Sequence, residues 1–391
     1  MSKNPIENRN IHVLIYSHGI ISGAFRMMMD ILENIDRNKF RFSVAYKPEY
    51  SEWGTYETDC IRKTGAQIIP LRGKRLFDFR GFIDLWKALH KEKIDILHCW
   101  DVLGIPGRII GKLARVKVVE SLANPPPELI FEISLKHYFI NKMTSVFVDG
   151  FIACSKEIVR RYQEQKPVFL KAKVVSAVYN CVRVPELNMS TENISRIRRQ
   201  YGLNSSDRVL TNIGYFNVQK AQNDLLYAFK NVVGKKSDAR LFIIGWGTLE
   251  KDLKDLTANL GLTDRVIFTG KLARPQVFEI LSITDLFVLS SHWEGFGIVL
   301  TEAMALRKPV VSTDTDGSRE VIENGKTGIL VPTKNPPALA QAILALLEKP
   351  DLMAQMGEEG FRRLNELFNC EQYIKGYEDF YKAVLSIEAE N

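Results

Sequence analysis

The chain has 391 residues, of which 46% are hydrophobic and 25% are charged. This composition is typical of a globular protein and excludes a disordered, collagen-like or disulfide-rich chain, and the length predicts two domains. The five cysteines form no Cys-x-x-Cys pair, so we expect no zinc site and a reducing, cytoplasmic compartment. The N-terminus lacks the apolar core of a signal peptide, and no uncharged apolar run reaches the roughly 18 residues of a membrane-spanning helix.

The positive charge lies in the first half of the chain. Residues 1–185 contain 29 Lys and Arg against 19 Asp and Glu, whereas residues 186–391 contain 24 against 27. This excess favours an anionic partner, either a membrane surface or a phosphorylated lipid, and an ordinary solvated surface is an equal alternative. Residues 72–80 mix basic and aromatic side chains, which suits either a peripheral contact with anionic lipid at the inner face of the plasma membrane or a grip on an acceptor phosphate. A basic loop that leads into the next helix is the slightly favoured alternative. The positive charge is the only feature that would favour nucleic acid as a partner, so we do not expect nucleic-acid binding.

Short apolar runs alternate with helical patterns in the first half. Residues 82–89 carry apolar side chains at i, i+3, i+4 and i+7, which predicts a helix. The alternation of strand and helix indicates βαβ units and a parallel sheet. The expected strands are residues 12–16, 42–46, 67–69, 95–98, 116–119 and 151–154.

The second half repeats this alternation after a polar stretch, residues 185–207, where we place the hinge. The predicted fold class is therefore α/β, with two Rossmann-like, doubly wound parallel-sheet domains facing across a cleft. Ligands in such sheets bind beyond the carboxyl ends of the strands. The expected strands of the second half are residues 208–213, 240–244, 265–269, 285–289, 309–312 and 328–331.

Two glutamates follow one of these strands. Glu294 stands in a glycine-containing loop, and Glu302 lies about one turn into the helix that begins near Gly297. The loop glycines let backbone N–H groups approach a ligand, and the helix N-terminus favours an anion such as a diphosphate. A carboxylate would repel phosphate, so the glutamates are suited to accept hydrogen bonds from sugar and ribose hydroxyls.

The segment from Asp285 to Pro332 resembles the retaining glycosyltransferases of family 4, which have the GT-B fold of two Rossmann-like domains. Residues 213–220 are similar to the phosphate-binding segment of that family, and residues 241–247 and 260–270 to its next two strand–loop units. The resemblance covers nearly all of the second domain. It is looser in the first half, at residues 19–24, 95–98, 151–155 and 179–180.

The resemblance implies roles for individual residues. Glu294 is expected to contact the donor sugar, Glu302 the ribose and Lys220 the diphosphate, with Glu294 and Lys220 as the catalytic residues. It also implies an acceptor-binding domain over residues 1–185, a donor-binding domain over 186–369, and a helix at 370–391 that packs back on the first domain. The expected donor-binding residues are Gly23, Gly214, Tyr215, Lys220, Gly245, Gly270, Glu294, Gly295, Phe296, Gly297 and Glu302.

The chain departs from the family pattern at two places. Tyr215 stands where the family usually has Arg, and a neutral phenol cannot replace a guanidinium on phosphate, so either another cation substitutes or the diphosphate is held less firmly. Ala123 and Asn124 follow the strand at which many members carry His. The candidates for the acceptor side are His18, His98 and Asn124.

The resemblance thus implies a hexosyltransferase that moves a sugar with retention from a nucleotide-diphosphate-sugar, a UDP-sugar for preference, to a glycan or lipid-linked acceptor. This activity belongs to surface polysaccharide or glycoconjugate biosynthesis, and the family uses no metal or other cofactor. Tyr215 and Ala123 favour an alternative, a catalytically silent nucleotide-sugar-binding or scaffold subunit of a glycan-assembly complex. A different GT-B enzyme, such as a nucleotide-sugar epimerase, fits the glutamate segment less well. A dehydrogenase is disfavoured because no Gly-x-Gly-x-x-Gly follows the first strand.

Overall fold

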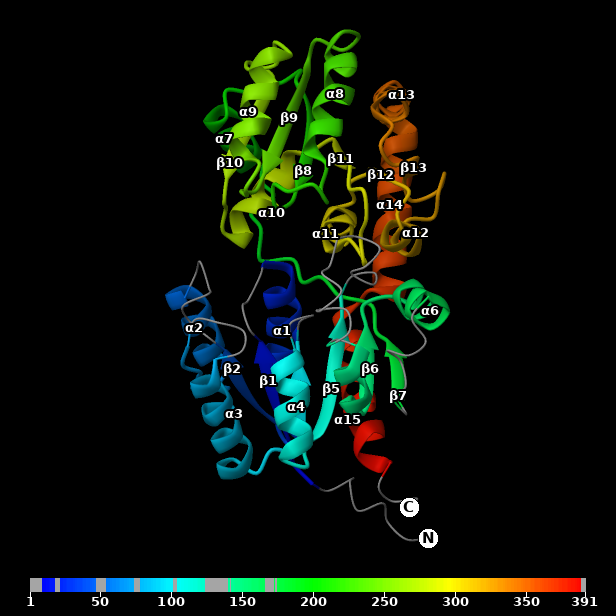
Figure 1. The fold of residues 1–391 in the computed structure, drawn as a ribbon. Helices are drawn as coiled ribbons and strands as arrows, with labels where there is room; N and C mark the ends of the chain where they lie inside the picture. Colours follow the sequence, from blue (N-terminus) through cyan, green and yellow to red (C-terminus); the bar gives the residue numbers. More distant parts are fainter. Residues whose placement is uncertain are drawn as a thin grey trace. The chain divides into compact units, whose positions relative to one another are not determined.

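A computed structural model of the chain describes residues 9–17, 22–46, 54–73, 78–100, 104–123, 140, 142–165, 172 and 174–387. The chain divides into two compact units (Figure 1). The first consists of Met1–Cys181 together with Cys370–Asn391, and the second of Val182–Asn369. The first segment of the first unit thus ends at Cys181, four residues before the domain boundary predicted at residue 185.

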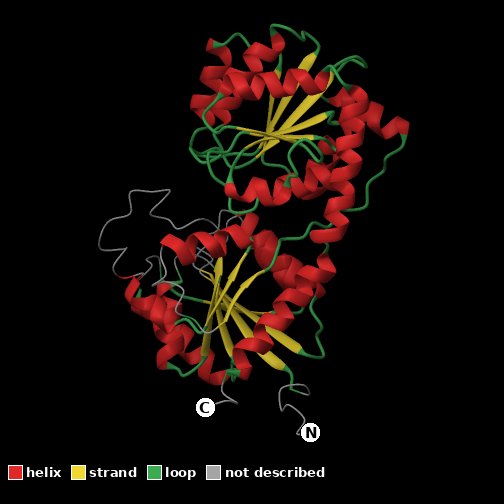
Figure 2. Cartoon of the chain, turned by 90° about the vertical axis from the view of Figure 1, so that its right-hand side faces the viewer, coloured by secondary structure: helices red, strands yellow, loops and turns green. Residues whose placement is uncertain are grey.

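The first unit is built on a seven-stranded sheet with the order β3-β2-β1-β4-β5-β6-β7. All neighbouring strands are parallel, and the order reverses direction between β1 and β4, as in a Rossmann fold. Helices lie on both faces of the sheet (Figure 2), so the strands are buried on both faces and read as continuous apolar runs. The strands are β1 (Ile11–Ser17), β2 (Phe40–Tyr46), β3 (Gln67–Pro70), β4 (Ile96–Cys99), β5 (Lys117–Leu122), β6 (Gly150–Ala153) and β7 (Val174–Ala177).

The helices of the first unit follow its strands in alternation. The predicted helix at 82–89 is the centre of α3 (Phe79–Lys91), which begins where the Asp78 carboxylate accepts a hydrogen bond from the Arg80 amide at 3.0 Å. The others are α1 (Ser22–Asn34), α2 (Gly54–Lys63), α4 (Ile105–Leu113), the 3₁₀ turn η3 (Ser145–Phe147), α6 (Lys156–Gln165) and α15 (Cys370–Ser386).

Helix α15 packs on the first sheet although it ends the chain. The Tyr373 hydroxyl donates to the carbonyl of Met27 in α1 at 2.9 Å. Two glycines let the helix approach closely: a Cβ at Gly150 would lie 2.7 Å from Val384, and one at Gly376 would lie 2.8 Å from Val178. The last helix is therefore part of the core of the first unit.

The second unit contains a six-stranded parallel sheet with the order β10-β9-β8-β11-β12-β13. The order reverses direction between β8 and β11, so this sheet repeats the order of the first six strands of the first sheet, which has β7 in addition. The strands are β8 (Arg208–Ile213), β9 (Ala239–Ile244), β10 (Val266–Gly270), β11 (Leu286–Leu289), β12 (Val310–Thr313) and β13 (Ile329–Val331). The helices are α7 (Thr191–Gln200), α8 (Gln222–Val233), α9 (Glu250–Asn259), α10 (Arg274–Ile283), α11 (Ile298–Ala305), α12 (Asp316–Val321), α13 (Pro336–Leu347) and α14 (Pro350–Leu367).

The α/β class and the two parallel-sheet, Rossmann-like domains predicted from the sequence are confirmed. The core of the second unit joins strands β8, β9 and β11 to the apolar faces of α8 and α13. In the part of the chain that the structure describes, no helix is both long and apolar enough to span a membrane.

Candidate active site

The candidate site lies at the carboxyl edge of the second sheet. Neighbouring strands β8 and β11 end at Ile213 and Leu289, and the loops that follow, residues 214–221 and 290–297, lead into α8 and α11. The strand order reverses between these two strands, and ligands of doubly wound sheets bind at such a switch point. The Ser290 hydroxyl donates to the carbonyl of Lys220 at 2.9 Å, and the His292 amide donates to the carbonyl of Gln219 at 2.8 Å, which ties the two loops together.

An ion pair joins the expected catalytic residues. The Lys220 Nζ atom lies 2.6 Å from Oε1 of Glu294, and the Ser291 hydroxyl donates to the same oxygen at 2.6 Å. The side chain of Glu294 is 6% exposed and that of Lys220 19% exposed, so water screens the pair weakly. Oε2 of Glu294 makes no hydrogen bond with any described residue and can accept one from a ligand hydroxyl.

Glu302 is held in the same manner by a different cation. Its Oε1 atom lies 2.6 Å from NH1 of Arg274, the first residue of α10. The side chain of Glu302 is 9% exposed. Among the described residues, no hydrogen-bond donor reaches its Oε2 atom. Each of the two glutamates thus presents one fixed carboxylate with one oxygen left for a ligand.

Glycines bring the ends of β8 and β9 unusually close together. Gly245 has a φ of 144°, and a Cβ there would lie 2.0 Å from the carbonyl oxygen of Gly214. A Cβ at Gly247 would lie 2.5 Å from the backbone nitrogen of Phe216. A Cβ at Gly214 itself would lie 3.1 Å from Cγ of Lys220, so this glycine leaves room for the lysine stem.

The loop of residues 294–297 rests against the start of α12. Gly297 adopts a left-handed conformation with a φ of 86° at the N-terminus of α11, and Phe296 is buried against Phe368 with ring centroids 5.4 Å apart. The Gly317 amide donates to the carbonyl of Glu294 at 3.1 Å, and a Cβ at Gly317 would lie 2.5 Å from the Phe296 nitrogen. Only glycine therefore fits between α12 and the backbone at Gly295 and Phe296.

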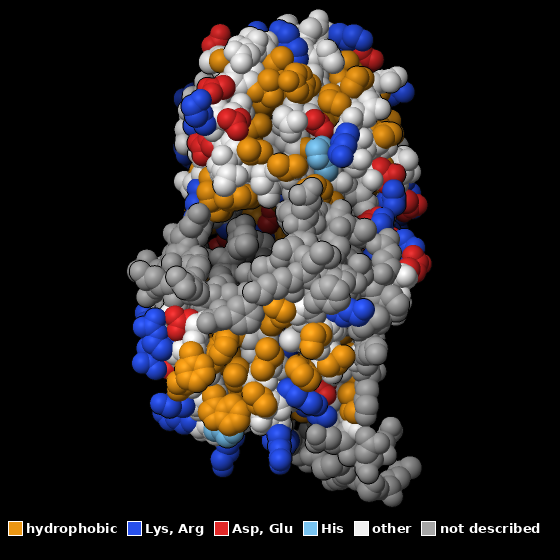
Figure 3. All heavy atoms as spheres, viewed as in Figure 1, with side chains coloured by type: hydrophobic (Ala, Val, Ile, Leu, Met, Phe, Trp, Pro, Cys, Tyr) orange, Lys and Arg blue, Asp and Glu red, His pale blue; other side chains and the backbone are white. Residues whose placement is uncertain are grey.

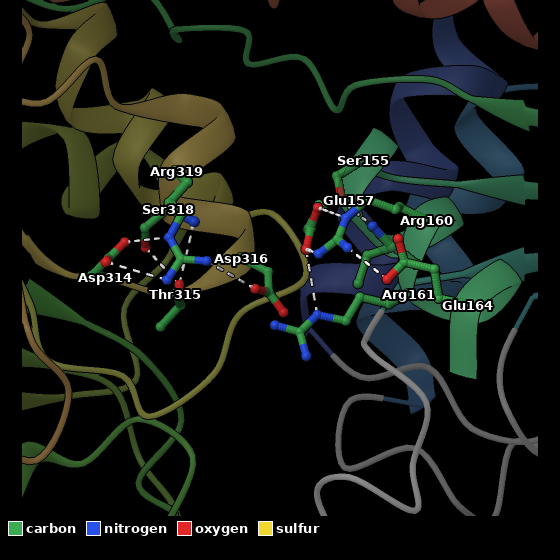
Figure 4. A network of polar contacts seen from close by, with 11 residues as sticks. Ser155, Glu157, Arg160, Arg161, Glu164, Asp314, Thr315, Asp316, Ser318 and Arg319 are labelled. Atoms are coloured by element: carbon green, nitrogen blue, oxygen red, sulfur yellow. Dashed lines mark hydrogen bonds and ion pairs between the residues drawn. The ribbon is translucent and has the colours of Figure 1, made fainter. Parts of the chain in front are cut away.

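A polar network fixes the first turn of α12 (Figure 4). Arg319 Nε donates to Asp314 Oδ1 at 2.6 Å, and the Thr315 hydroxyl accepts from the Ser318 amide at 3.2 Å as the N-cap. Because Gly317 lies between these residues, the network also holds the loop that carries Glu294.

An aromatic pair occupies the region of the expected arginine. The Tyr215 ring meets the Trp246 ring edge-on, with centroids 5.9 Å apart, and Lys271 Nζ lies 4.5 Å over the Trp246 ring. These residues follow β8, β9 and β10, so they share the carboxyl edge with Lys220. Gly270 ends β10 in a left-handed conformation with a φ of 66°, directly before Lys271.

The candidates of the first unit have different surroundings. Gly23 is exposed in the first turn of α1, and a Cβ there would meet no atom within 4 Å. His98 is fully buried: its ring nitrogens lie 2.8 Å from the Tyr381 hydroxyl and 2.8 Å from the Ser121 hydroxyl, and burial lowers its pKa to about 3. This environment makes His98 a neutral link between β4 and α15, with no ring nitrogen left for an acceptor. His18 and Asn124 lie outside the described residues.

Sequence reasoning missed three residues of the site. Ser291 and Gly317 lie inside the segment that carries the resemblance, and their roles depend on side-chain and backbone contacts that the pattern does not specify. Arg274 lies 28 positions before Glu302, ahead of a proline, and nothing in the sequence marks it as a partner of a carboxylate. The described residues contain no group of three or more His, Cys, Asp and Glu that could hold a metal ion.

The chain matches known families and structures over most of its length. Residues 193–363 match the family model of glycosyl transferases group 1, and residues 21–184 match that of glycosyltransferase family 4. N-acetyl-alpha-D-glucosaminyl L-malate synthase of Bacillus anthracis is 33% identical over 76% of this chain and 77% of its own length. UDP-Gal:alpha-D-GlcNAc-diphosphoundecaprenol alpha-1,3-galactosyltransferase of Escherichia coli is 24% identical over 93% and 94%. The crystal structure of Anabaena HepE in complex with UDP-glucose superposes with a TM-score of 0.81 at 20% identity, over 96% of this chain and 100% of that one.

Proposed function

This chain belongs to the family 4 glycosyltransferases, and on that premise we propose that it transfers a hexose from a UDP-sugar, with retention at the anomeric carbon, to a glycan or lipid-linked acceptor. The activity class follows from the family matches in both halves and from the similarity to named glycosyltransferases. The donor nucleotide, the stereochemistry, the acceptor and the individual site residues are parts of the proposal.

The observation that carries the proposal is the pair of fixed carboxylates at the switch point of the second sheet. Glu294 is held by Lys220 and Ser291, and Glu302 by Arg274, each through Oε1. A nucleotide sugar offers two sets of hydroxyls, on the hexose and on the ribose, separated by a diphosphate. In our proposal Glu294 accepts from the hexose, Glu302 accepts from the ribose, and Lys220 faces the diphosphate between them.

Chemically, the leaving group of the reaction is the diphosphate, which gains negative charge as the glycosidic bond breaks. A lysine ammonium that is already held by Glu294, which Ser291 fixes in turn, stabilises that charge without reorganising in the reaction. Tyr215 supplies no charge at this position, and Lys271, held over the Trp246 ring, is our candidate for the second cation.

The names of the relatives support a UDP-sugar donor and leave two acceptor classes. The E. coli relative uses a UDP-sugar and a diphosphoundecaprenol-linked acceptor, whereas the B. anthracis relative is named for L-malate. The bound ligand of the HepE structure is UDP-glucose. We favour the lipid-linked acceptor because the first half of the chain carries the positive charge.

The test combines donor binding with donor turnover. Thermal unfolding is followed with UDP, GDP and ADP, since a ligand that binds the native state raises the melting temperature. The nucleotide with the largest shift defines the base. Sugars linked to that nucleotide then serve as donors, and release of the nucleotide is measured with a polyprenol-diphosphate sugar, with L-malate or without an acceptor. The anomeric configuration of any product is determined by NMR. Binding without transfer or hydrolysis under all conditions would favour the silent subunit instead.

We further propose that α3 and α4 of the first unit contact an anionic membrane. Arg72 and Arg80, from the basic stretch 72–80, are paired with Asp84 at 2.8 Å and with Asp78 at 3.0 Å, so they add little charge; Lys74 and Arg75 lie outside the described residues. The two helices instead expose large apolar side chains, with Phe79 74%, Trp86 39% and Leu113 63% exposed. Figure 3 shows apolar side chains gathered on the first unit with Lys and Arg at the margins. Besides Arg80, the exposed Lys and Arg residues described on or beside these helices are Lys87, Lys91, Lys93, Lys112 and Arg115.

A further inference from the structure

Arg274 is fixed at three points beside the donor site. Its NH1 atom donates to Oε1 of Glu302 at 2.6 Å, and its NH2 atom donates to the carbonyl of Arg183 at 2.8 Å. The guanidinium carbon lies 4.8 Å over the ring of Phe278, one turn further along α10. The two edges of one rigid guanidinium are thus used for two different acceptors, which a lysine ammonium cannot reproduce with the same geometry.

The partner of this guanidinium is a carboxylate with one occupied and one unoccupied oxygen. Glu302 lies in α11, and its side chain is 9% exposed, against 24% for that of Arg274. A glutamate in water samples several rotamers, and a charge-assisted hydrogen bond to one oxygen selects the rotamer and thereby the direction of the other oxygen. Oε2 makes no hydrogen bond with the residues that the structure describes.

We infer that Arg274 is a positioning residue for nucleotide recognition: it fixes Glu302 so that Oε2 accepts a hydrogen bond from the ribose 2′-hydroxyl. The inference rests on the proposed function, because it takes the ribose contact of Glu302 from there. Discrimination between ribose and deoxyribose would then depend on Arg274, although Arg274 itself contacts neither the sugar nor the phosphates.

The experiment compares two nucleotides that differ by one hydroxyl. The affinities of UDP and 2′-deoxy-UDP are measured by calorimetry for the wild type, Glu302→Gln, Arg274→Met and Arg274→Lys; if GDP or ADP proves to be the ligand, the corresponding deoxynucleotide is used. A hydrogen bond to a charged acceptor is worth a preference for the ribonucleotide of about ten-fold or more. Arg274→Met is expected to reduce this ratio to nearly that of Glu302→Gln, and Arg274→Lys to an intermediate value.

A matched control comes from the same unit. Arg307 also pairs with a carboxylate, Glu358, at 2.7 Å and lies over an aromatic ring, Phe361, at 3.7 Å, but it follows the C-terminus of α11 and its partner is not Glu302. Arg307→Met should leave the ratio unchanged. Thermal unfolding without ligand measures any general loss of stability, which would weaken both nucleotides equally and leave their ratio intact.

The outcomes separate the inference from the function on which it rests. A ratio that collapses in Glu302→Gln but stays at the wild-type value in both Arg274 variants overturns the inference and leaves the ribose contact in place. A ratio that is unchanged in Glu302→Gln as well shows that Glu302 does not contact the 2′-hydroxyl, and the inference fails; an unchanged affinity of Glu302→Gln for UDP itself would remove the proposed ribose contact altogether. Should Arg274→Met not fold, the Arg274→Lys ratio decides in the same way.

Discussion

Lys220 Nζ and Glu294 Oε1 lie 2.6 Å apart, although 74 positions of sequence separate the two residues. The contact unites the lysine of one loop with the glutamate of another, at the point where the sheet order reverses. Both side chains are largely buried, so neither charge is compensated by water if its partner is removed. If Lys220 binds the diphosphate as we propose, stability and ligand binding are coupled through this one pair.

A single and a double variant separate these two roles. Lys220→Met leaves the Glu294 carboxylate without its cation and is expected to lower the free energy of unfolding by about 1–3 kcal/mol. Adding Glu294→Gln removes the uncompensated charge and should recover part of that loss. The affinity for UDP, by contrast, should stay low in both variants, while the affinity for uridine changes little. Urea unfolding and calorimetry measure the two quantities, and equal weakening of uridine and UDP would assign Lys220 to folding alone.

The close approach of β8 and β9 predicts a severe effect of one added methyl group. Gly245→Ala places Cβ 2.0 Å from the Gly214 carbonyl oxygen, and it strains a backbone with a φ of 144°. We expect a loss of roughly 3 kcal/mol or more in unfolding free energy, because backbone atoms cannot yield as a side chain does. Gly202→Ala is the control: its φ is 65°, but its Cβ would meet no atom within 4 Å. If the two variants unfold at the same urea concentration, the clash is absent.

The burial of His98 predicts that acid destabilises the first unit. The pKa of His98 falls from 6.5 to about 3 because its ring is buried. Below pH 6.5 the unfolded chain binds a proton that the folded chain does not, so the unfolding free energy falls as the pH falls from 6.5 toward 3. At pH 5 the loss amounts to about 2 kcal/mol.

Removing the imidazole should remove this dependence. His98→Gln is expected to be less stable than the wild type at pH 7.5 but to lose less further stability by pH 5, as measured by urea midpoints at both values. His90→Gln, on the exposed surface of α3, should show the wild-type pH dependence. An unchanged acid loss in His98→Gln would mean that other groups, such as the buried His12, whose pKa burial also lowers, dominate.

Membrane contact by α3 and α4 predicts sedimentation with anionic vesicles. Each basic residue near an anionic surface contributes about 1 kcal/mol, so Lys87→Glu/Lys91→Glu should abolish most binding to phosphatidylglycerol vesicles, and high salt should weaken it. Trp86→Ala should weaken binding at any salt concentration, because an aromatic ring anchors at the interface. Lys251→Glu/Lys254→Glu, on α9 of the second unit, is the control for charge alone. Equal sedimentation of both double variants, or binding to neutral vesicles, would contradict the contact.

The sequence predicted the parts of the fold that local chemistry determines. Strands β1 and β8 were predictable because strands covered on both faces are unbroken apolar runs. Strand β7, Val174–Ala177, was missed: it has four residues, is only half-buried and includes a serine, so it lacks that signature. The periodicity of residues 82–89 predicted a helix, while its start at Phe79 depends on the Asp78 cap.

In the candidate site, too, local sequence patterns revealed some residues, whereas others depend on tertiary contacts. Glu294 and Glu302 were recognisable because each stands in a fixed pattern of glycines and apolar residues. Arg274 was not, because its contact with Glu302 exists only once β10, β9, β8 and β11 have placed α10 and α11 at one edge of the sheet. Tyr215 was noticed as a departure, but its packing against Trp246 could not be foreseen, since the two residues belong to different loops.

The membership of α15 in the first unit has a consequence for the order in which the protein is made. The second unit is continuous in sequence, Val182–Asn369, and has all its residues once Asn369 has left the ribosome. At that point the first unit still lacks helix α15, which supplies Tyr373 and Tyr381. His98 therefore lacks its hydrogen bond with the Tyr381 hydroxyl, and the Met27 carbonyl lacks the one from Tyr373. The unit that is translated first is thus the last to be completed, and a premature stop just before Tyr373 would leave every residue of the second unit in place but remove partners of the first.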